Sequence, residues 1–310
     1  LIFNYIIILM NINNTKDLFK ALNIDKDKTL SISEKKFLLR EGYIILHKKI
    51  KGNILKRLNY ISKKLIRVEK TRGGWEGKEE YYKNGKEFDP GNNRLGNLIE
   101  KNEIFKEVIK IPEILVAANT VIKSKFKICG LNLRDPKKGR GKQVIHTDWK
   151  PRKKIRERFA GVVCMIYLDD SNKKNGATRI IPKSHHKIGW PDKFINIKKK
   201  HKREIRPELK AGSIIILNLN LWHAGAENLS GKSRKMLMLN IKNRTLPQLL
   251  NYKKYLSKKT KKNLSSVEKY LLAVRKEDKT QKSKSIGVGV YYKKDFNIAD
   301  KNEIIYRNKN

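Results

Sequence analysis

Three residues that can bind one metal ion lie in two distant segments of this sequence. His146 and Asp148 form a His-x-Asp pair, and His223 follows 77 residues after His146, at the end of the largely apolar run Ser213–Trp222. On a β-strand the side chains at positions i and i+2 point to the same face, so the pair can direct both donor atoms at one ion. The third ligand must then come from a neighbouring strand. The pattern therefore predicts a β-rich fold that brings the two segments together.

The ligand types leave the identity of the metal open. Two imidazoles and one carboxylate occupy one face of an octahedral ion and leave positions for a co-substrate and dioxygen, as in non-haem Fe(II) oxygenases. Zinc also binds two histidines and a carboxylate. A His-x-Asp pair occurs by chance in many proteins, and a histidine after an apolar strand often serves only in packing. Iron, zinc and no metal are therefore all compatible with the three residues alone.

Arg234 adds a second chemical feature eleven residues after His223. The intervening segment is rich in Gly, Asn and Ser, which predicts a turn, and the residues from Arg234 onward read as the next strand. A hairpin of that length would bring Arg234 back beside His223. A guanidinium near an open metal position suits bidentate binding of a carboxylate, such as that of an α-keto acid that chelates the metal. Taken alone, Arg234 would more simply be an ordinary surface arginine.

The segment between the two halves of the motif carries a family resemblance. Asn175-Gly176 is followed by Pro182-Lys183-Ser184-His185. With the His-x-Asp pair, the distal histidine and the arginine, this segment resembles the phytanoyl-CoA dioxygenase family of Fe(II)/2-oxoglutarate oxygenases. The resemblance runs from about Leu30 to Leu250. Lys183 stands where the family usually has glycine, which predicts an altered turn after Pro182.

The resemblance implies roles for single residues. The implied ligands of Fe(II) are His146, Asp148 and His223. It further implies that Arg234 binds the distal carboxylate of 2-oxoglutarate, while Gln143 and Thr178 are candidates for additional polar contacts to this co-substrate. His185 and His186 are expected to be structural or to line the pocket.

The resemblance also implies a reaction. Related halogenating enzymes carry a small residue in place of the carboxylate, so that chloride takes the vacant metal position. Asp148 is intact, which favours oxygen insertion. We therefore expect a dioxygenase that consumes O2 and 2-oxoglutarate, hydroxylates a small molecule and releases succinate and CO2. The identity of the substrate stays open, because one scaffold serves many chemistries.

Seven segments have the length and composition of β-strands. Seven strands with flanking helices suit a mainly β fold, a double-stranded β-helix or jelly roll of the cupin-like barrel type. The strand candidates are Lys125–Arg134, Gln143–Asp148, Phe159–Leu168, Ala177–Ile181, Glu204–Leu209, Ser213–Asn218 and Arg234–Lys242.

Helices are expected on both sides of the strand region. Ser31-Ile32-Ser33-Glu34 and Ser265-Ser266-Val267-Glu268 have capping-box spacing, which predicts that a helix begins after each first serine. Apolar residues from Leu55 to Val68 predict an amphipathic helix, and two helices are expected from about Lys101 to Ser124. We expect an N-terminal extension over residues 1–30, the oxygenase domain over 31–250 and a C-terminal helical extension with a basic tail over 251–310.

The net charge raises a competing hypothesis. With 73 Lys and Arg against 30 Asp and Glu, the formal charge of +43 would suit nucleic acid or an anionic membrane surface. Lysine dominates, however, and the basic residues are dispersed with few aromatic residues between them, unlike a nucleic-acid-binding pattern. Two basic clusters, Lys150–Arg158 and Asn196–Arg203, lead to the hypothesis that the substrate is anionic. The remaining alternatives are a cupin-like metal protein that does not use 2-oxoglutarate and, third, a nucleic-acid-binding protein.

Cysteine usage and hydropathy bear on location. Cys129 and Cys164 lie in apolar runs without the spacing of a metal or redox motif, which predicts buried thiols in a reducing cytoplasm. The apolar segment Leu1–Met10 is too short to span a bilayer, so no membrane insertion is expected. We expect translation to begin at Met10, with residues 1–9 as an upstream extension that is not translated. The oligomeric state stays open.

Overall fold

Six antiparallel strands form the main sheet, in the order β1-β6-β4-β8-β3-β2. The computed structural model describes residues 12–70, 73–74, 91–278, 290–291 and 305–306. Four of the expected strands are confirmed here, with ends that differ from the expected ones by two residues or fewer. The strands of the main sheet are β1 (Tyr43–Leu46), β2 (Asn92–Leu95), β3 (Phe126–Pro136), β4 (Gly161–Tyr167), β6 (Ile214–Asn218) and β8 (Met236–Asn243).

The residues of β4 explain why this sheet is covered on both faces. All of them are buried. Cys164 and Ile166 belong to the core shared with the helices, whereas Met165 and Tyr167 belong to the core inside the barrel. Because side chains alternate along a strand, a run that is apolar on both faces is buried only between two layers.

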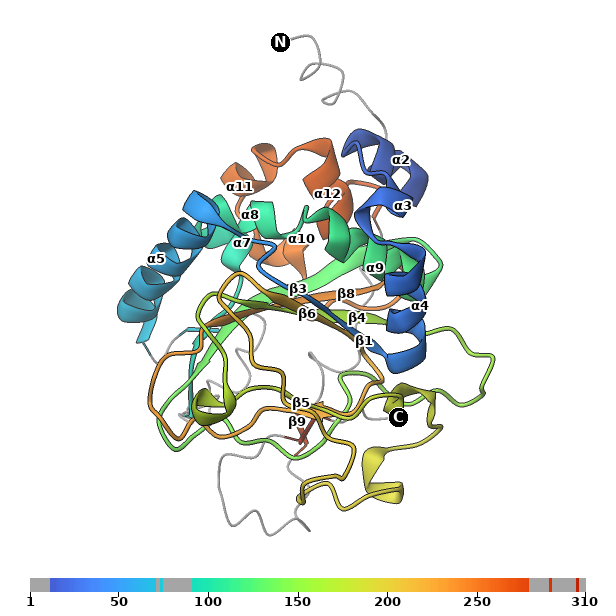
Figure 1. Ribbon diagram of the computed structural model, residues 1–310. Coiled ribbons are helices and arrows are strands. Elements are labelled where there is room, and N and C mark those ends of the chain that lie inside the picture. Colours follow the sequence, from blue (N-terminus) through green and yellow to red (C-terminus); the bar gives the residue numbers. More distant parts are fainter. Residues whose placement is uncertain (1–11, 71–72, 75–90, 279–289, 292–304, 307–310) are drawn as a thin grey trace.

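A second, shorter sheet lies across the inner face of the main sheet (Figure 1). In it β5 (Arg179–Ile180) pairs with β7 (His223–Ala224). Ile205 bridges to Ile180 on one side, and His146 bridges to His223 on the other. The two layers form the expected jelly roll, in which the second sheet is reduced to very short pairings.

The expected strand Gln143–Asp148 is wrong as a regular strand, because it pairs only at His146. Beyond this bridge the backbone N–H groups of Asp148 and Trp149 both donate to the carbonyl oxygen of Leu219, at 2.9 and 3.2 Å. These bonds turn the backbone out of the ladder and place Asp148 in a bend.

The expected strand Glu204–Leu209 is also wrong as a regular strand, because it forms isolated bridges only at Ile205 and Leu209. Pro207 lies between the two bridges. Proline has no backbone N–H and cannot donate to a ladder, so continuous pairing is interrupted there.

Helices cover the outer face of the main sheet (Figure 1). Both capping boxes are confirmed, since Ser31 begins one helix and Ser265 begins another with the reciprocal hydrogen bonds of the motif. The helices are α2 (Thr15–Ala21), α3 (Lys26–Thr29), α4 (Ile32–Glu41), α5 (Gly52–Glu69), α7 (Leu98–Lys101), α8 (Ile104–Val108), α9 (Pro112–Ile122), α10 (Tyr252–Tyr255), α11 (Lys258–Lys262) and α12 (Ser266–Leu272).

The two helices expected from about Lys101 to Ser124 are confirmed as α8 and α9, and α7 ends where this region begins. The side chain of Asn102 accepts from the N–H of Ile104 at 3.0 Å, at the start of α8. Pro112 then starts α9, where its missing N–H is not needed. In α5, Leu58 is buried as expected, but Val68 is 70% exposed and does not belong to the buried face.

The described parts of the two extensions pack into the core between the helices and the main sheet. Phe19 of α2 and Tyr270 of α12 both belong to the core that covers the outer face of the sheet. The predictions for residues 1–10, including the translation start, lie outside the described residues, as does most of the expected basic tail. Two short strands near the C-terminus, β9 (Val290–Tyr291) and β10 (Ile305–Tyr306), pair with each other.

The membrane question can be addressed for the described helices. Among the residues described, none of the helices combines the length and the apolar character that crossing a membrane requires.

Candidate metal centre

His146 and His223 are held side by side by the backbone of the short sheet. The N–H of His146 donates to the carbonyl of His223 at 3.0 Å, and the N–H of His223 donates to the carbonyl of His146 at 3.1 Å. Residues that face each other in such an antiparallel pair direct their side chains to the same side. The ring centroids are accordingly 4.6 Å apart.

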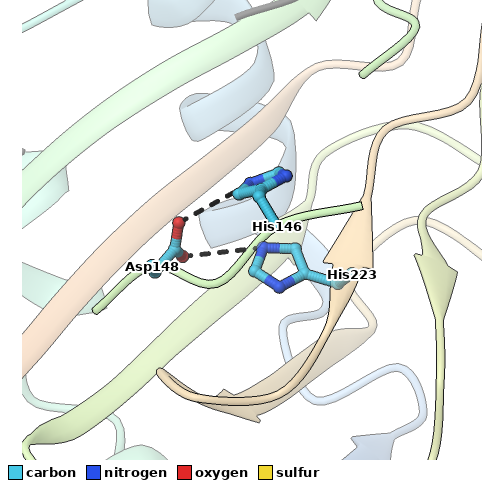
Figure 2. Close-up of side chains that lie close together, drawn as sticks. All are labelled: His146, Asp148 and His223. Atoms are coloured by element: carbon cyan, nitrogen blue, oxygen red, sulfur yellow. Dashed lines mark ion pairs between the residues drawn. The ribbon is translucent and has the colours of Figure 1, made fainter. Parts of the chain in front are cut away.

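Asp148 completes a three-residue cluster (Figure 2). Its Oδ1 lies 3.8 Å from Nε2 of His146, and its Oδ2 lies 3.6 Å from Nε2 of His223. One donor atom from each of the three residues lies within 4.8 Å of the others. Within the described residues, this is the one group of three or more such side chains with that geometry.

Backbone carbonyl groups orient both imidazoles. Nδ1 of His146 lies 2.9 Å from the carbonyl oxygen of Val144, and Nδ1 of His223 lies 2.9 Å from that of Leu221. These bonds require the proton on Nδ1, so in the neutral tautomer each Nε2 presents a lone pair toward Asp148. Metal-binding histidines are oriented in this way by a partner on the other ring nitrogen.

Burial favours the neutral form of His146 that a metal requires. His146 and His223 are 5% and 2% exposed. Burial, with the neighbouring His223 acting in the same direction, lowers the pKa of His146 to about 4. A neutral imidazole is the form that binds a cation.

Asp148 gives a direct test of whether the residues fit a cation. Its Oδ2 is buried and has no hydrogen-bond partner among the described residues. Buried polar atoms are normally paired, and a lone carboxylate oxygen facing two imidazole lone pairs is unfavourable until a positive charge lies between them. The donor set therefore fits a divalent metal ion such as Fe(II) or zinc.

The cluster lies in a pocket inside the barrel. Its empty space, counted out to open solvent, is about 490 Å³. The sequence candidates Gln143, Thr178 and Arg234 all line it. Its other walls are formed by Asn92, Arg134, Gly141, Met165, Ala224, Gly225, Met236 and Met238.

Arg234 is a buried cation without a carboxylate partner. It is 4% exposed, and burial lowers the pKa of its guanidinium. Its Nε donates to the carbonyl oxygen of Asn175 at 3.3 Å, and no ion pair of its side chain occurs within the part of the chain that the structure describes. A guanidinium in this situation suits an incoming carboxylate.

The expected hairpin between His223 and Arg234 is wrong, although both residues line the pocket. β7, which carries His223, pairs with β5 in the short sheet, whereas β8, which follows Arg234, pairs with β3 and β4 in the main sheet. The connection crosses from one layer of the barrel to the other, so the two side chains face the pocket from opposite layers.

Gln143 and Thr178 are placed at the pocket in different ways. The Oε1 of Gln143 accepts from the N–H of Gly225 at 2.8 Å, so this oxygen already helps to hold the turn after β7. Thr178 is 3% exposed, and its Oγ1 lies 2.7 Å from the hydroxyl oxygen of Tyr167.

The sequence analysis missed Tyr167, Met165 and Arg134 as pocket or near-pocket residues. Tyr167 is fully buried, burial raises the pKa of its phenol, and the charge of Arg234 acts in the opposite direction. Alternation along the expected strand Phe159–Leu168 would have placed Met165 and Tyr167 on one face together. The sequence did not show which face looks into the pocket.

His185 and His186 bind the end of α4. Nε2 of His185 lies 3.1 Å from the carbonyl oxygen of Leu39, and Nε2 of His186 lies 3.1 Å from that of Arg40. Neither belongs to the metal-ligand group. The turn before them keeps the geometry expected for glycine, since Lys183 adopts φ +64° in the left-handed region.

The sequence match to a known family covers the site. The model of the phytanoyl-CoA dioxygenase family matches residues 61–236, more than half of the chain. Two uncharacterised proteins, from Mycobacterium bovis and Mycobacterium tuberculosis, are each 33% identical to this chain over 76 residues, 24% of this chain and 26% of theirs. The matched part thus spans about a quarter of the length of these relatives.

Solved structures share the fold. The epimerase SnoN, solved with Fe3+, α-ketoglutarate and nogalamycin RO, has a TM-score of 0.55 and 13% identity over 72% of this chain and 87% of its own. HygX from Streptomyces hygroscopicus, with nickel and 2-oxoglutarate bound, has a TM-score of 0.53 and 12% identity over 71% and 89%. The carbocyclase SnoK has a TM-score of 0.55 and 13% identity over 71% and 87%. At these identities the likeness shows the fold alone.

Proposed function

This chain belongs to the phytanoyl-CoA dioxygenase family, and on that basis we propose that it is an Fe(II)- and 2-oxoglutarate-dependent oxygenase. The observation that carries the proposal is the convergence of two oriented imidazoles, one unpaired carboxylate oxygen and one buried guanidinium on a single pocket. A cupin-like protein that only binds a metal would have no use for the guanidinium.

In this proposal His146, Asp148 and His223 hold the iron, and Arg234 binds the distal carboxylate of 2-oxoglutarate. The bound iron and co-substrate supply the oxidising chemistry, with O2 consumed and succinate and CO2 released. Thr178 contacts the co-substrate together with Tyr167, and Gln143 supports the wall of the pocket through Gly225. The two layers of the barrel exclude water from the reacting atoms.

The primary substrate is a small molecule, and hydroxylation is the proposed outcome because Asp148 is retained. Structural relatives include an epimerase and a carbocyclase, so the fold itself is compatible with other oxidative outcomes. SnoN was solved with nogalamycin RO and HygX with hygromycin B. Both basic clusters are hydrogen-bonded to residues close to the proposed metal ligands. The N–H of Ile145 donates to the carbonyl oxygen of Ile197 in the second cluster, and the side-chain amide of Asn220 donates to the carbonyl oxygen of Lys150 in the first. Their position supports an anionic substrate.

We also propose that residues 31–250 form the oxygenase domain and that the enzyme works in a reducing compartment such as the cytoplasm. Cys129 and Cys164 are buried free thiols, as expected where disulfides are rare.

The test is to measure 2-oxoglutarate consumption and succinate release with ferrous iron, in the wild type, in His146→Ala and in His47→Ala. His47 is exposed and serves as the matched control. We expect iron-dependent turnover of 2-oxoglutarate in the wild type and in His47→Ala, even without the primary substrate, and none in His146→Ala. A folded wild type with neither turnover nor metal-dependent 2-oxoglutarate binding would exclude the proposal.

A further inference from the structure

Lys242 is a buried cation that the proposed co-substrate site does not use. It lies on β8 and is 1% exposed, and its Nζ is 4.0 Å from the centroid of the Trp149 ring. Within the described residues, its side chain forms no hydrogen bond and no ion pair. Burial lowers its pKa, while attraction to Asp148 acts in the opposite direction. Keeping an ammonium in such a place is unfavourable unless it has a partner.

Two other buried cations of this protein have anionic partners. Lys235 is 7% exposed and lies 2.8 Å from the carboxylate of Asp169. Arg179 is 4% exposed and lies 2.7 Å from Glu204. Lys242 and the unpaired Arg234 differ from these two, and Arg234 has a proposed ligand. The contrast suggests that Lys242 also serves a ligand.

The position of Lys242 relative to Arg234 follows from strand geometry. Met236 and Met238 of β8 line the metal pocket. Because alternate residues of a strand share a face, Asn240 and Lys242 continue the same inner face, eight residues beyond Arg234. The pocket-lining residues Met236 and Met238 therefore lie between two buried cations, Arg234 just before β8 and Lys242 near its end.

Two neighbours of Lys242 strengthen the case for an anion. Asn240 is 5% exposed and, two residues before Lys242 on β8, lies on the same face of the strand. Lys127 of β3 faces Lys242 directly in the sheet register and is 3% exposed. Like charges directly opposite each other in a sheet are destabilising. An anion at this place would relieve the repulsion and use the amide.

We propose that Lys242, with Asn240 beside it, binds a carboxylate or phosphate group of the primary substrate, at the opposite end of the pocket from Arg234. This inference rests on the proposed function, which is what identifies the anion bound at Lys242 as part of the primary substrate. Trp149 follows Asp148 directly in the sequence, so a substrate held against Lys242 and Trp149 is brought beside the metal ligands.

The experiment follows the indole N–H signal of Trp149 by NMR in the full-length, metal-free protein labelled with ¹⁵N-tryptophan. Trp149→Phe identifies the signal. Acetate and inorganic phosphate are the anionic probes, and acetamide is the neutral control. We expect a saturable shift with acetate, phosphate or both, and none with acetamide. The anion that binds more tightly distinguishes a carboxylate from a phosphate substrate.

The variants are Lys242→Met, Lys242→Gln and Lys242→Arg, with Lys64→Met on the exposed side of α5 as the matched control. We expect both neutral variants to weaken anion binding at least about tenfold, as for loss of a hydrogen bond to a charged group. Lys242→Arg and Lys64→Met should retain it. Two neutral variants are used so that the test survives if one fails to fold.

The inference is overturned if the folded wild type responds to neither anion, or if a folded neutral variant responds like the wild type. The measurement needs neither iron nor turnover. Turnover of 2-oxoglutarate without an anion response would therefore remove only this inference, and the reverse result would remove only the proposed oxygenase activity.

Discussion

His146 and His223 exchange two backbone hydrogen bonds, of 3.0 and 3.1 Å, across a single antiparallel bridge. This pairing fixes the separation of the two imidazoles by main-chain geometry, independently of any bound ion. Asp148, placed in the bend that follows, brings its carboxylate to both Nε2 atoms. The candidate centre is therefore largely built before a metal arrives.

A first prediction concerns metal-linked stability. Adding Mn(II) or zinc should raise the unfolding temperature of the wild-type protein. Its free energy of unfolding should rise by about 2.7 kcal/mol when the metal concentration is a hundredfold above the dissociation constant. Asp148→Ala should lose this gain, because binding weakens when the carboxylate that faces both imidazoles is removed. Thermal unfolding with and without metal checks it. An equal gain in the variant would contradict the assignment of Asp148.

A second prediction concerns Arg234. Arg234→Met should raise the KM for 2-oxoglutarate by about 10- to 150-fold, corresponding to the 1.5–3 kcal/mol of a hydrogen bond to a charged group. Arg234→Lys should raise this KM less than Arg234→Met does, because lysine keeps the positive charge but not the planar guanidinium group. Arg67→Met, an exposed position on α5, is the control. Unchanged co-substrate dependence of succinate release in Arg234→Met would point to a metalloenzyme that does not use 2-oxoglutarate.

A third prediction concerns acid stability. Burial lowers the pKa of His185 from 6.5 to about 4, with His186 acting in the same direction. Between these values the unfolded chain binds more protons than the folded chain, so the free energy of unfolding should fall as the pH falls from 6.5 to about 4. His185→Gln should weaken this dependence. Urea unfolding at several pH values measures it, and an identical dependence in both proteins would argue against a neutral, buried His185.

A fourth prediction concerns the turn at Lys183. Its φ of +64° is unfavourable for a residue with a side chain, and glycine avoids this strain but loses more entropy on folding. Lys183→Gly should therefore stabilise the protein by up to about 1 kcal/mol. Lys187→Gly, at an ordinary φ of −67°, should destabilise it. Chemical unfolding measures both variants, and the argument is refuted if both change the free energy of unfolding in the same direction.

Local features of this protein were predictable because their causes are local. The serines that begin α4 and α12 form their hydrogen bonds within the next three residues, so the sequence alone contains both partners. Four of the six strands of the main sheet, β3, β4, β6 and β8, were predictable from runs of apolar residues. Gln143–Asp148 was not, since its pairing is ended by bonds to Leu219, a residue distant in sequence.

The path of the chain between His223 and Arg234 shows a second feature that the sequence could not predict. Eleven residues containing a turn are compatible with a hairpin or with a crossing between layers. Only the pairing partners of β7 and β8 decide between them, and those partners lie elsewhere in the chain. The prediction that Arg234 lies at the pocket held although the expected path was wrong.

The sequence by itself determined the types of donor atoms, the family and the jelly-roll class, because these depend on residue identity and on local periodicity. Only the tertiary structure decided that His146 and His223 pair directly, that Tyr167 and Thr178 meet beside Arg234, and that Lys242 is buried without an anion. Those relationships arise from strand pairing and burial across long sequence separations, and no local pattern encodes which distant side chains will share one enclosed space.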